Sequence, residues 1–322
     1  MIPRAPDVRV PSFWIVRPDR VYEYLAILMA GELDVFGTSA GGRPLHAVRF
    51  PRPGAQDTFL LLAGLYGHEP GTVAAAINFL EVLRCDRDLR AKPWPQIVRA
   101  ARTMNVIVVP MLNPDARQRC PDSLVGFPTP ALRYYARGLT RAGQLGPAAE
   151  AHDGVNPEQM LLLGGFYDDA GLPSDRHHSP MLTSSASAKH LFAYLDRYKP
   201  TAALVLHAGY APRFHMTRTF PEEFREKLRA AHRRAAQRIA AGGAKMRPLA
   251  GDRELASTGE NDTARMLHLR YGALAAIFEG RQGLLDKLPA CDHDQILDEY
   301  LVAIEEFIQE GVGGFLPRVE PS

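Results

Sequence analysis

The sequence predicts an α/β protein, a three-layer α/β/α sandwich with a mixed, mostly parallel sheet in the middle. Apolar runs of strand length alternate with helical patterns along the chain, which is the order expected when helices cover both faces of a sheet. Most of these runs are continuously apolar, as in strands buried on both faces. The 322 residues include 46% hydrophobic and 23% charged side chains, so the chain is long and apolar enough for a large core.

Each expected element has a local signal. We expect strands at residues 44–50, 58–66, 104–112, 201–208 and 273–280. The helical patterns lie at residues 71–85, 185–198, 221–241 and 293–311.

The interval from about 120 to 180 differs from the rest. It is rich in Gly, Pro and polar residues and shows little sustained periodicity, so we expect a long loop-rich insertion, and connections of this length are usually functional. The sequence contains no repeat and no composition shift that would mark a linker. We therefore expect a single domain over residues 1–322.

Composition excludes several classes of protein. A net charge of +2 is too small to indicate nucleic acid binding, and we interpret the basic segment 225–238 as a solvated helix face. Three scattered cysteines without CxxC spacing indicate neither a disulfide framework nor a thiolate zinc site. The first 20 residues lack the apolar stretch of a signal peptide, and no segment is long enough to span a membrane. We expect a cytoplasmic protein without nucleic acid or membrane partners.

Three of the expected buried strands lead to residues that can bind metal or move protons. His68 and Glu69 follow the second strand, His207 ends the fourth and Glu279 ends the last. Ligands of open α/β sheets bind beyond the carboxyl ends of the strands, where such side chains converge.

Each of these residues also has a purely structural alternative. Pro70 places Glu69 just before a helix, where it could cap that helix or pair with an arginine. His207 could be a hydrogen-bonded core histidine. Glu279 is harder to explain in this way, because a carboxylate after several apolar strand positions costs desolvation unless it is paired, protonated or used.

Five segments together resemble the zinc metallocarboxypeptidase family, the carboxypeptidase A/B group. They occur in the family's order: "GTSAGGRPLHAVRF", "AGLYGHEPGT" at the place of the first metal motif, "VIVVPMLNPDARQR", "ALVLHAG" and "ALAAIFEG". The resemblance is greatest to bacterial members with a long insertion carrying a "GGFYDDAG"-like segment. It implies the metallocarboxypeptidase fold over most of the chain.

The resemblance also implies a set of site residues. Glu69 and His207 would be zinc ligands, and Glu279 would be the base that activates the metal-bound water. Arg119 or Arg117 would stabilise the tetrahedral oxyanion, and the sequence does not choose between them. The family's Asn-Arg pair, which binds a substrate carboxylate, would fall on Asp175 and Arg176.

Several positions depart from the family pattern. Tyr66 stands where the first histidine ligand is expected, so the third ligand of the zinc ion is either the Tyr66 phenolate or His68, with His177 and His178 as further donors. Asp175 replaces an asparagine, and its charge would oppose a substrate carboxylate. Ala116 replaces a glycine, and residues 251–262 contain no tyrosine to match the family's mobile substrate-capping tyrosine.

Two functions are consistent with these residues. The first is a zinc hydrolase that cleaves an amide bond next to a free carboxylate, in a peptide or, as in aspartoacylase-like deacylases, in an N-acyl amino acid. The second is a degraded relative that binds a ligand without turnover. The base glutamate at position 279 favours the hydrolase.

Overall fold

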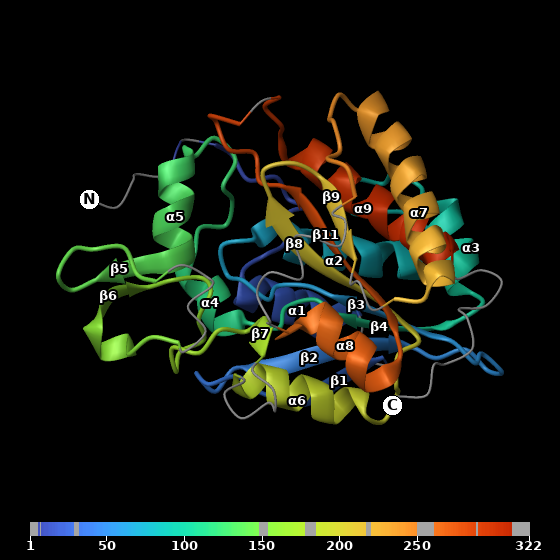
Figure 1. Ribbon diagram of the computed structural model, residues 1–322, viewed down its shortest axis with the longest axis horizontal. Helices are drawn as coiled ribbons and strands as arrows, with labels where there is room; N and C mark the ends of the chain where they lie inside the picture. The colour runs from blue at the N-terminus through green and yellow to red at the C-terminus, as the bar shows by residue number, and fades with distance from the viewer. Residues whose placement is uncertain are drawn as a thin grey trace.

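One mixed sheet of seven strands forms the centre of the protein, in the order β1-β2-β4-β3-β8-β11-β9 (Figure 1). The computed structural model describes residues 6, 8–28, 32–147, 154–177, 185–216, 220–249, 261–287 and 289–310, with the side chains of 176, 177 and 261 left out. The seven strands are β1 (Leu33–Thr38), β2 (Pro44–Phe50), β3 (Thr58–Leu62), β4 (Asn105–Val109), β8 (Ala202–Gly209), β9 (Arg213–Met216) and β11 (Leu274–Arg281).

The four central strands, β4, β3, β8 and β11, are parallel. The outer pairs β1–β2, β2–β4 and β9–β11 are antiparallel. The prediction of a mixed, mostly parallel sheet is therefore confirmed.

Helices cover both faces of this sheet (Figure 1). The helices of the larger hydrophobic core are α1 (Pro18–Leu28), α2 (Pro70–Cys85), α3 (Pro95–Ala101), α7 (Glu222–Ala241) and α9 (His293–Gln309). The opposite core is covered by α6 (Ala186–Leu195) and α8 (Thr263–Tyr271). Three layers of helix, sheet and helix result, as expected from the sequence.

The connection from β3 to α2 is tighter than the sequence suggests. We expected the strand to continue to residue 66, but it ends at Leu62 because Gly64 has a φ of 64°. A side chain at Gly64 would also stand 2.8 Å from the Cα of Met111. The chain then turns through residues 65–69, and α2 begins at Pro70.

The segment between residues 120 and 177 contains more regular structure than predicted. It includes α5 (Thr129–Arg137), a two-stranded sheet of β5 (Gly138–Thr140) and β6 (Met160–Leu163), and a 3₁₀ turn η1 (Pro157–Gln159). These elements lie to one side of the main sheet, next to α4 (Pro114–Arg119) in Figure 1. A second short pairing joins β7 (Arg176–His177) to β10 (Asn261–Asp262).

The basic helix α7 is only partly a solvated face. Arg234 and Arg238 pair with Glu306 and Glu305 of α9, at distances of 2.6 and 3.0 Å. These ion pairs join the two helices across the same side of the sheet. Among the described residues, no helix has both the length and the apolar character needed to cross a lipid bilayer.

Candidate active site

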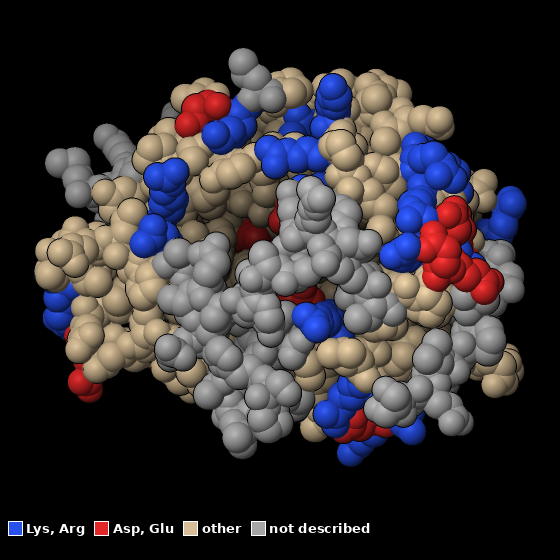
Figure 2. All heavy atoms as spheres, in the orientation of Figure 1, with Lys and Arg blue, Asp and Glu red and all other residues tan. Residues whose placement is uncertain are grey.

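The carboxyl ends of β3, β8 and β11 meet at one edge of the sheet and bring together Glu69, His207 and Glu279. His207 of β8 and Glu279 of β11 are direct partners in the parallel ladder, so both side chains point to the same face. The Oε2 atom of Glu69 lies 3.1 Å from Nδ1 of His207. Figure 2 shows a hollow beside the end of β8, with acidic side-chain atoms at its base.

Glu69 does not use its side chain as a helix cap. It occupies the position before Pro70 without a side-chain cap hydrogen bond, and its carbonyl oxygen instead accepts the hydroxyl of Thr72 at 2.8 Å. The buried carboxylate is thus directed at His207. The capping alternative considered for Glu69 is wrong.

His207 lies between two carboxylates. Its Nδ1 faces Glu69, and its Nε2 lies 3.3 Å from Oδ2 of Asp175, an ion-pair distance without the alignment of a hydrogen bond. Burial disfavours the charged imidazole, but the two carboxylates outweigh burial and raise the pKa of His207 well above its usual value. The backbone carbonyl of His207 accepts the hydroxyl of Tyr300 at 2.8 Å.

Tyr66 and His68 lie on one side of this cluster. The Tyr66 hydroxyl is 3.4 Å from Oδ2 of Asp175, which places it at the Nε2 side of His207 rather than beside Glu69. The His68 ring stacks on the Tyr66 ring with centroids 5.6 Å apart, and its buried Nδ1 has no hydrogen bond. Burial, with smaller contributions from the charges of His207 and Arg117, lowers the pKa of His68 to about 3, so this imidazole is neutral.

A second histidine contacts the predicted base. Nε2 of His215 lies 3.1 Å from Oε2 of Glu279, and a guanidinium nitrogen of Arg213 lies 4.0 Å from the same oxygen. Burial alone would raise the pKa of Glu279, but the close contact with His215 and the charges of His215, His207 and Arg213 lower it. Glu279 is therefore ionised at neutral pH.

The sequence did not indicate His215 or Arg213 as site residues. Both belong to the four-residue edge strand β9, which was not among the expected strands. The alternation of Arg213 and His215 with the buried Phe214 and Met216 is the period-two signal that could have identified this strand.

The two arginines assigned to the oxyanion point elsewhere. Arg117 is buried and donates to the carbonyl oxygens of Gly67, Cys120 and Pro121, the middle contact measuring 2.6 Å. Burial lowers its pKa. These contacts hold the loop before Glu69 against the start of the insertion, which is a structural role.

Arg119 pairs with Asp169 and donates to the carbonyl oxygen of Tyr167 at 2.6 Å. Asp169 also accepts from Arg43 at 2.8 Å, so Arg119 is part of an ion-pair network next to the site. The hydrogen bonds of Arg117 and Arg119 all go to groups other than His207 and Glu279, so this geometry does not support the oxyanion role for either arginine.

Asp175 does not face open space as a substrate-binding residue would. It is 3% exposed, and its Oδ1 accepts the backbone N–H of Thr263 at 3.1 Å. The side chain of Arg176, predicted to bind the substrate carboxylate, lies outside the described residues, as do those of His177 and His178. Most of the segment expected to carry a capping tyrosine, residues 251–260, also lies outside them.

The donors of the site match a zinc ion in part. Catalytic zinc is held by three protein ligands at about 2.0–2.2 Å, which places neighbouring donor atoms roughly 3.3 Å apart. Glu69 Oε2 and His207 Nδ1, at 3.1 Å, have this spacing. Within the described part of the chain, no three His, Cys, Asp or Glu side chains are grouped so that they could hold a metal ion. Glu69 and His207 are thus adjacent as an ion pair, and neither Tyr66 nor His68 joins them to complete a three-donor zinc site, so the described residues do not fit the ion as they stand.

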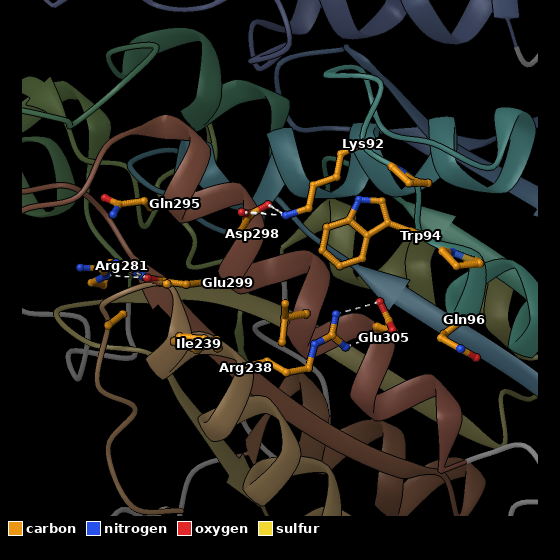
Figure 3. A pocket seen from close by; sticks show the side chains of 16 residues that line it. Lys92, Trp94, Gln96, Arg238, Ile239, Arg281, Gln295, Asp298, Glu299 and Glu305 are labelled. Carbon is orange, nitrogen blue, oxygen red and sulfur yellow. Dashed lines mark hydrogen bonds and ion pairs between the residues drawn. The ribbon is translucent and has the colours of Figure 1, made fainter.

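A separate cavity of about 600 Å³ lies between α3, α7 and α9 (Figure 3). Trp94, Ile239 and Val302 form apolar parts of its wall. The charged side chains around it pair with one another, as in Lys92 with Asp298 at 2.9 Å. Neither Glu69, His207 nor Glu279 lines this cavity, so it is distinct from the candidate active site.

Comparison with known proteins connects this geometry to a family. Residues 30–120 match the family model described as zinc carboxypeptidase. This range includes Tyr66, His68, Glu69, Arg117 and Arg119, but neither His207 nor Glu279. A search of curated proteins found no match.

Solved structures show the same fold over most of the chain. Bovine thrombin-activatable fibrinolysis inhibitor, in complex with tick carboxypeptidase inhibitor, is 12% identical with a TM-score of 0.62, covering 94% of this chain and 99% of that one. A metallo-carboxypeptidase from Burkholderia cenocepacia is 13% identical with a TM-score of 0.61, covering 92% and 69%. A metallo-carboxypeptidase from Pseudomonas aeruginosa, in complex with (2-guanidinoethylmercapto)succinic acid, is 13% identical with a TM-score of 0.59, covering 90% and 68%.

The family match and the fold agree, and the resemblance predicted from the sequence is confirmed. Residues 30–120 thus match the zinc carboxypeptidase family model, and the chain as a whole has the fold of the metallo-carboxypeptidases of known structure.

Proposed function

We propose that the protein is a metal-dependent hydrolase that cleaves an amide bond adjacent to a free carboxylate. The observation that carries the proposal is the meeting of Glu69, His207 and Glu279 at one edge of the sheet from three distant segments. An ion pair with a purely structural role would account for the contact between Glu69 and His207. It would not account for Glu279, which is an ionised and partly exposed carboxylate and lies next to His207 in the strand register.

In this proposal Glu69 and His207 hold a zinc ion. Bound there, zinc would supply Lewis-acid polarisation of a carbonyl group and a lower pKa for water. Glu279 is the proton acceptor, and it later delivers the proton to the leaving amine. His215 and Arg213 keep the Glu279 carboxylate ionised and hold it in place.

We propose Arg176 as the residue that binds the substrate's carboxylate, because a guanidinium can donate two parallel hydrogen bonds to a carboxylate. The substrate is then either a peptide with a free C-terminus or an N-acyl amino acid. An N-acylated dipeptide, the same dipeptide as a C-terminal amide, and an N-acyl amino acid distinguish these alternatives. Turnover of the amide at the rate of the free acid would contradict the proposal.

Metal analysis of protein purified without added zinc tests the metal site. We expect zinc to be retained by the wild-type protein and lost from Glu69→Ala and His207→Ala. His293→Ala is a matched control, because His293 is a buried histidine whose ring contacts Ser123, at 2.8 Å, and Trp14 rather than Glu69 or Glu279.

A second function is favoured by the incomplete donor set. Because the described residues group no third His, Cys, Asp or Glu donor with Glu69 and His207, the alternative is a chain that binds a ligand at this edge of the sheet without turnover. Protein that is free of zinc, yet binds N-acyl amino acids by calorimetry, would support this second function over the hydrolase.

A further inference from the structure

The cavity between α3, α7 and α9 has no part in the proposed hydrolysis, and its wall has the features of a small-molecule site. We propose that this cavity binds an uncharged, largely apolar small molecule. Its volume of about 600 Å³ lies within the range of about 300–1,000 Å³ that is usual for such sites. The inference concerns a second site, so it does not depend on the proposed function.

One face of α9 forms a side of the cavity. Gln295, Asp298, Val302 and Glu305 line it and recur at intervals of three or four residues, so they lie on the same face of the helix. The last turn of α7 and residues 92–96 form the other sides (Figure 3). The Val302 side chain is therefore directed into the cavity.

The Trp94 wall is fixed in place by contacts within the protein. The indole N–H of Trp94 donates to Oδ2 of Asp88 at 3.1 Å. Asp88 pairs with Arg90 at 2.6 Å, and Arg90 also reaches Asp298 of α9 at 2.7 Å. These contacts join the two sides of the cavity, so a ligand enters a preformed wall and little free energy is lost in ordering it.

The charged side chains of the wall pair with one another. They form three ion pairs: Lys92 with Asp298 at 2.9 Å, Arg238 with Glu305 at 3.0 Å, and Arg281 with Glu299 at 2.5 Å. Acids and bases are therefore equal in number among the lining residues that the structure describes. An ionic ligand would have to break a pair or lose its hydration without a counter-charge, and both cost free energy. A neutral ligand meets neither cost.

The remaining lining residues indicate the chemistry of the ligand. Trp94, Ile239 and Val302 supply apolar surface for its body. Gln96 and Gln295 lie at opposite ends of the cavity in Figure 3, and a primary amide can both donate and accept a hydrogen bond. The expected ligand thus has an apolar body, with a hydroxyl, carbonyl or amide group at an end.

A neutral fluorescent dye tests the inference without any substrate or metal. N-phenylnaphthylamine is uncharged and largely apolar, and Trp94 is one of two tryptophans in the sequence. In Trp14→Phe, Trp94 is the sole tryptophan. We expect this protein to bind a single dye molecule per chain with a saturable isotherm, and the Trp94 emission to be quenched in parallel with binding.

Filling the cavity should prevent binding. Val302→Phe should bind the dye about 10-fold more weakly or worse, because the added ring occupies volume that the dye needs. Val35→Phe is the matched control: Val35 is 62% exposed on β1 and does not line the cavity, so affinity should be unchanged. Ala244→Leu, which adds volume beyond the end of α7, replaces Val302→Phe if that variant does not fold.

A charged dye tests the proposed class of ligand. Anilinonaphthalene sulfonate has the same aromatic framework with a negative charge, and it should bind about 10-fold more weakly or worse because its sulfonate finds no free cation. Equal affinity for the two dyes would overturn the ligand class. Wild-type affinity in Val302→Phe, or an equal loss in Val35→Phe, would place the neutral dye elsewhere and overturn the site. A Trp14→Phe protein that is folded but does not bind the neutral dye would overturn both.

Discussion

Nε2 of His215 lies 3.1 Å from the carboxylate of Glu279, and the two residues come from the neighbouring antiparallel strands β9 and β11. His215 pairs in the ladder with Ile277, two residues before Glu279, so the contact is diagonal across the strand pair. An edge strand with no family motif thus supplies the partner of the predicted base.

Replacing His215 should weaken that base. We expect His215→Ala to lower kcat about 10-fold or more, because Glu279 loses the contact that orients it. Since His215 helps to lower the pKa of Glu279, its removal raises that pKa, and the acid limb of the kcat/KM profile moves to higher pH. His215→Gln, which keeps an N–H group near Glu279, should restore part of kcat, and an unchanged pH profile in His215→Ala would contradict this role.

Glu279→Gln should abolish turnover while zinc remains bound. Glutamine keeps the size of the side chain but cannot accept a proton from water near neutral pH. Metal analysis and turnover are measured on the same preparation, with the exposed Glu222→Gln on α7 as a control. Unchanged turnover would exclude Glu279 as the base, and loss of zinc would place it among the ligands.

Gly67→Ala should destabilise the loop that carries Glu69. A Cβ at this position would stand 2.3 Å from the backbone of Ala116 in α4, closer than non-bonded atoms approach. We expect a loss of about 1–3 kcal/mol in the free energy of unfolding, measured by urea denaturation, together with weaker zinc binding. Gly242→Ala, where the nearest atom would be Ile239 O at 3.4 Å, should leave both quantities unchanged.

Asp115→Asn should reduce stability at neutral pH and have less effect in acid. Burial would raise the pKa of Asp115, but hydrogen bonds from Ser39, Gly41 and Arg43 outweigh burial and lower it. A lowered native pKa stabilises the folded state above the unfolded-state pKa of about 3.9, and this contribution is lost as the pH falls through the native value.

We expect Asp115→Asn to cost about 1.5–3 kcal/mol in the free energy of unfolding at pH 7, measured by denaturant titration. The difference from the wild-type protein should shrink when the titration is repeated below about pH 4. A difference that stayed constant with pH would show that charge on Asp115 does not contribute.

The convergence of Glu69, His207 and Glu279 was predictable because local signals determine it. Continuous apolar runs indicate buried parallel strands, and parallel strands bring their carboxyl ends to one edge. The positions of the polar residues along those runs then decide which side chains meet. This can be predicted without knowing where the helices pack.

The partners of these residues were not predictable in the same way. Asp175 lies just before the two-residue strand β7, and His215 belongs to a four-residue strand, and elements this short give no periodic signal. Arg117 looked suited to a substrate because it is charged, yet it donates to backbone carbonyl oxygens that composition and spacing do not reveal. Contacts of this kind depend on how the elements pack.

The hydroxyl of Tyr300 donates to the carbonyl oxygen of His207, and its ring fills the space where a side chain at Gly280 would lie. Every strand of the main sheet has been synthesised by residue 281, but this contact requires α9. A nascent chain therefore lacks both this contact and the α9 part of the larger core until α9 has left the ribosome. Polypeptides arrested before residue 300 should therefore remain open to proteases along the sheet, including β8 around residue 207.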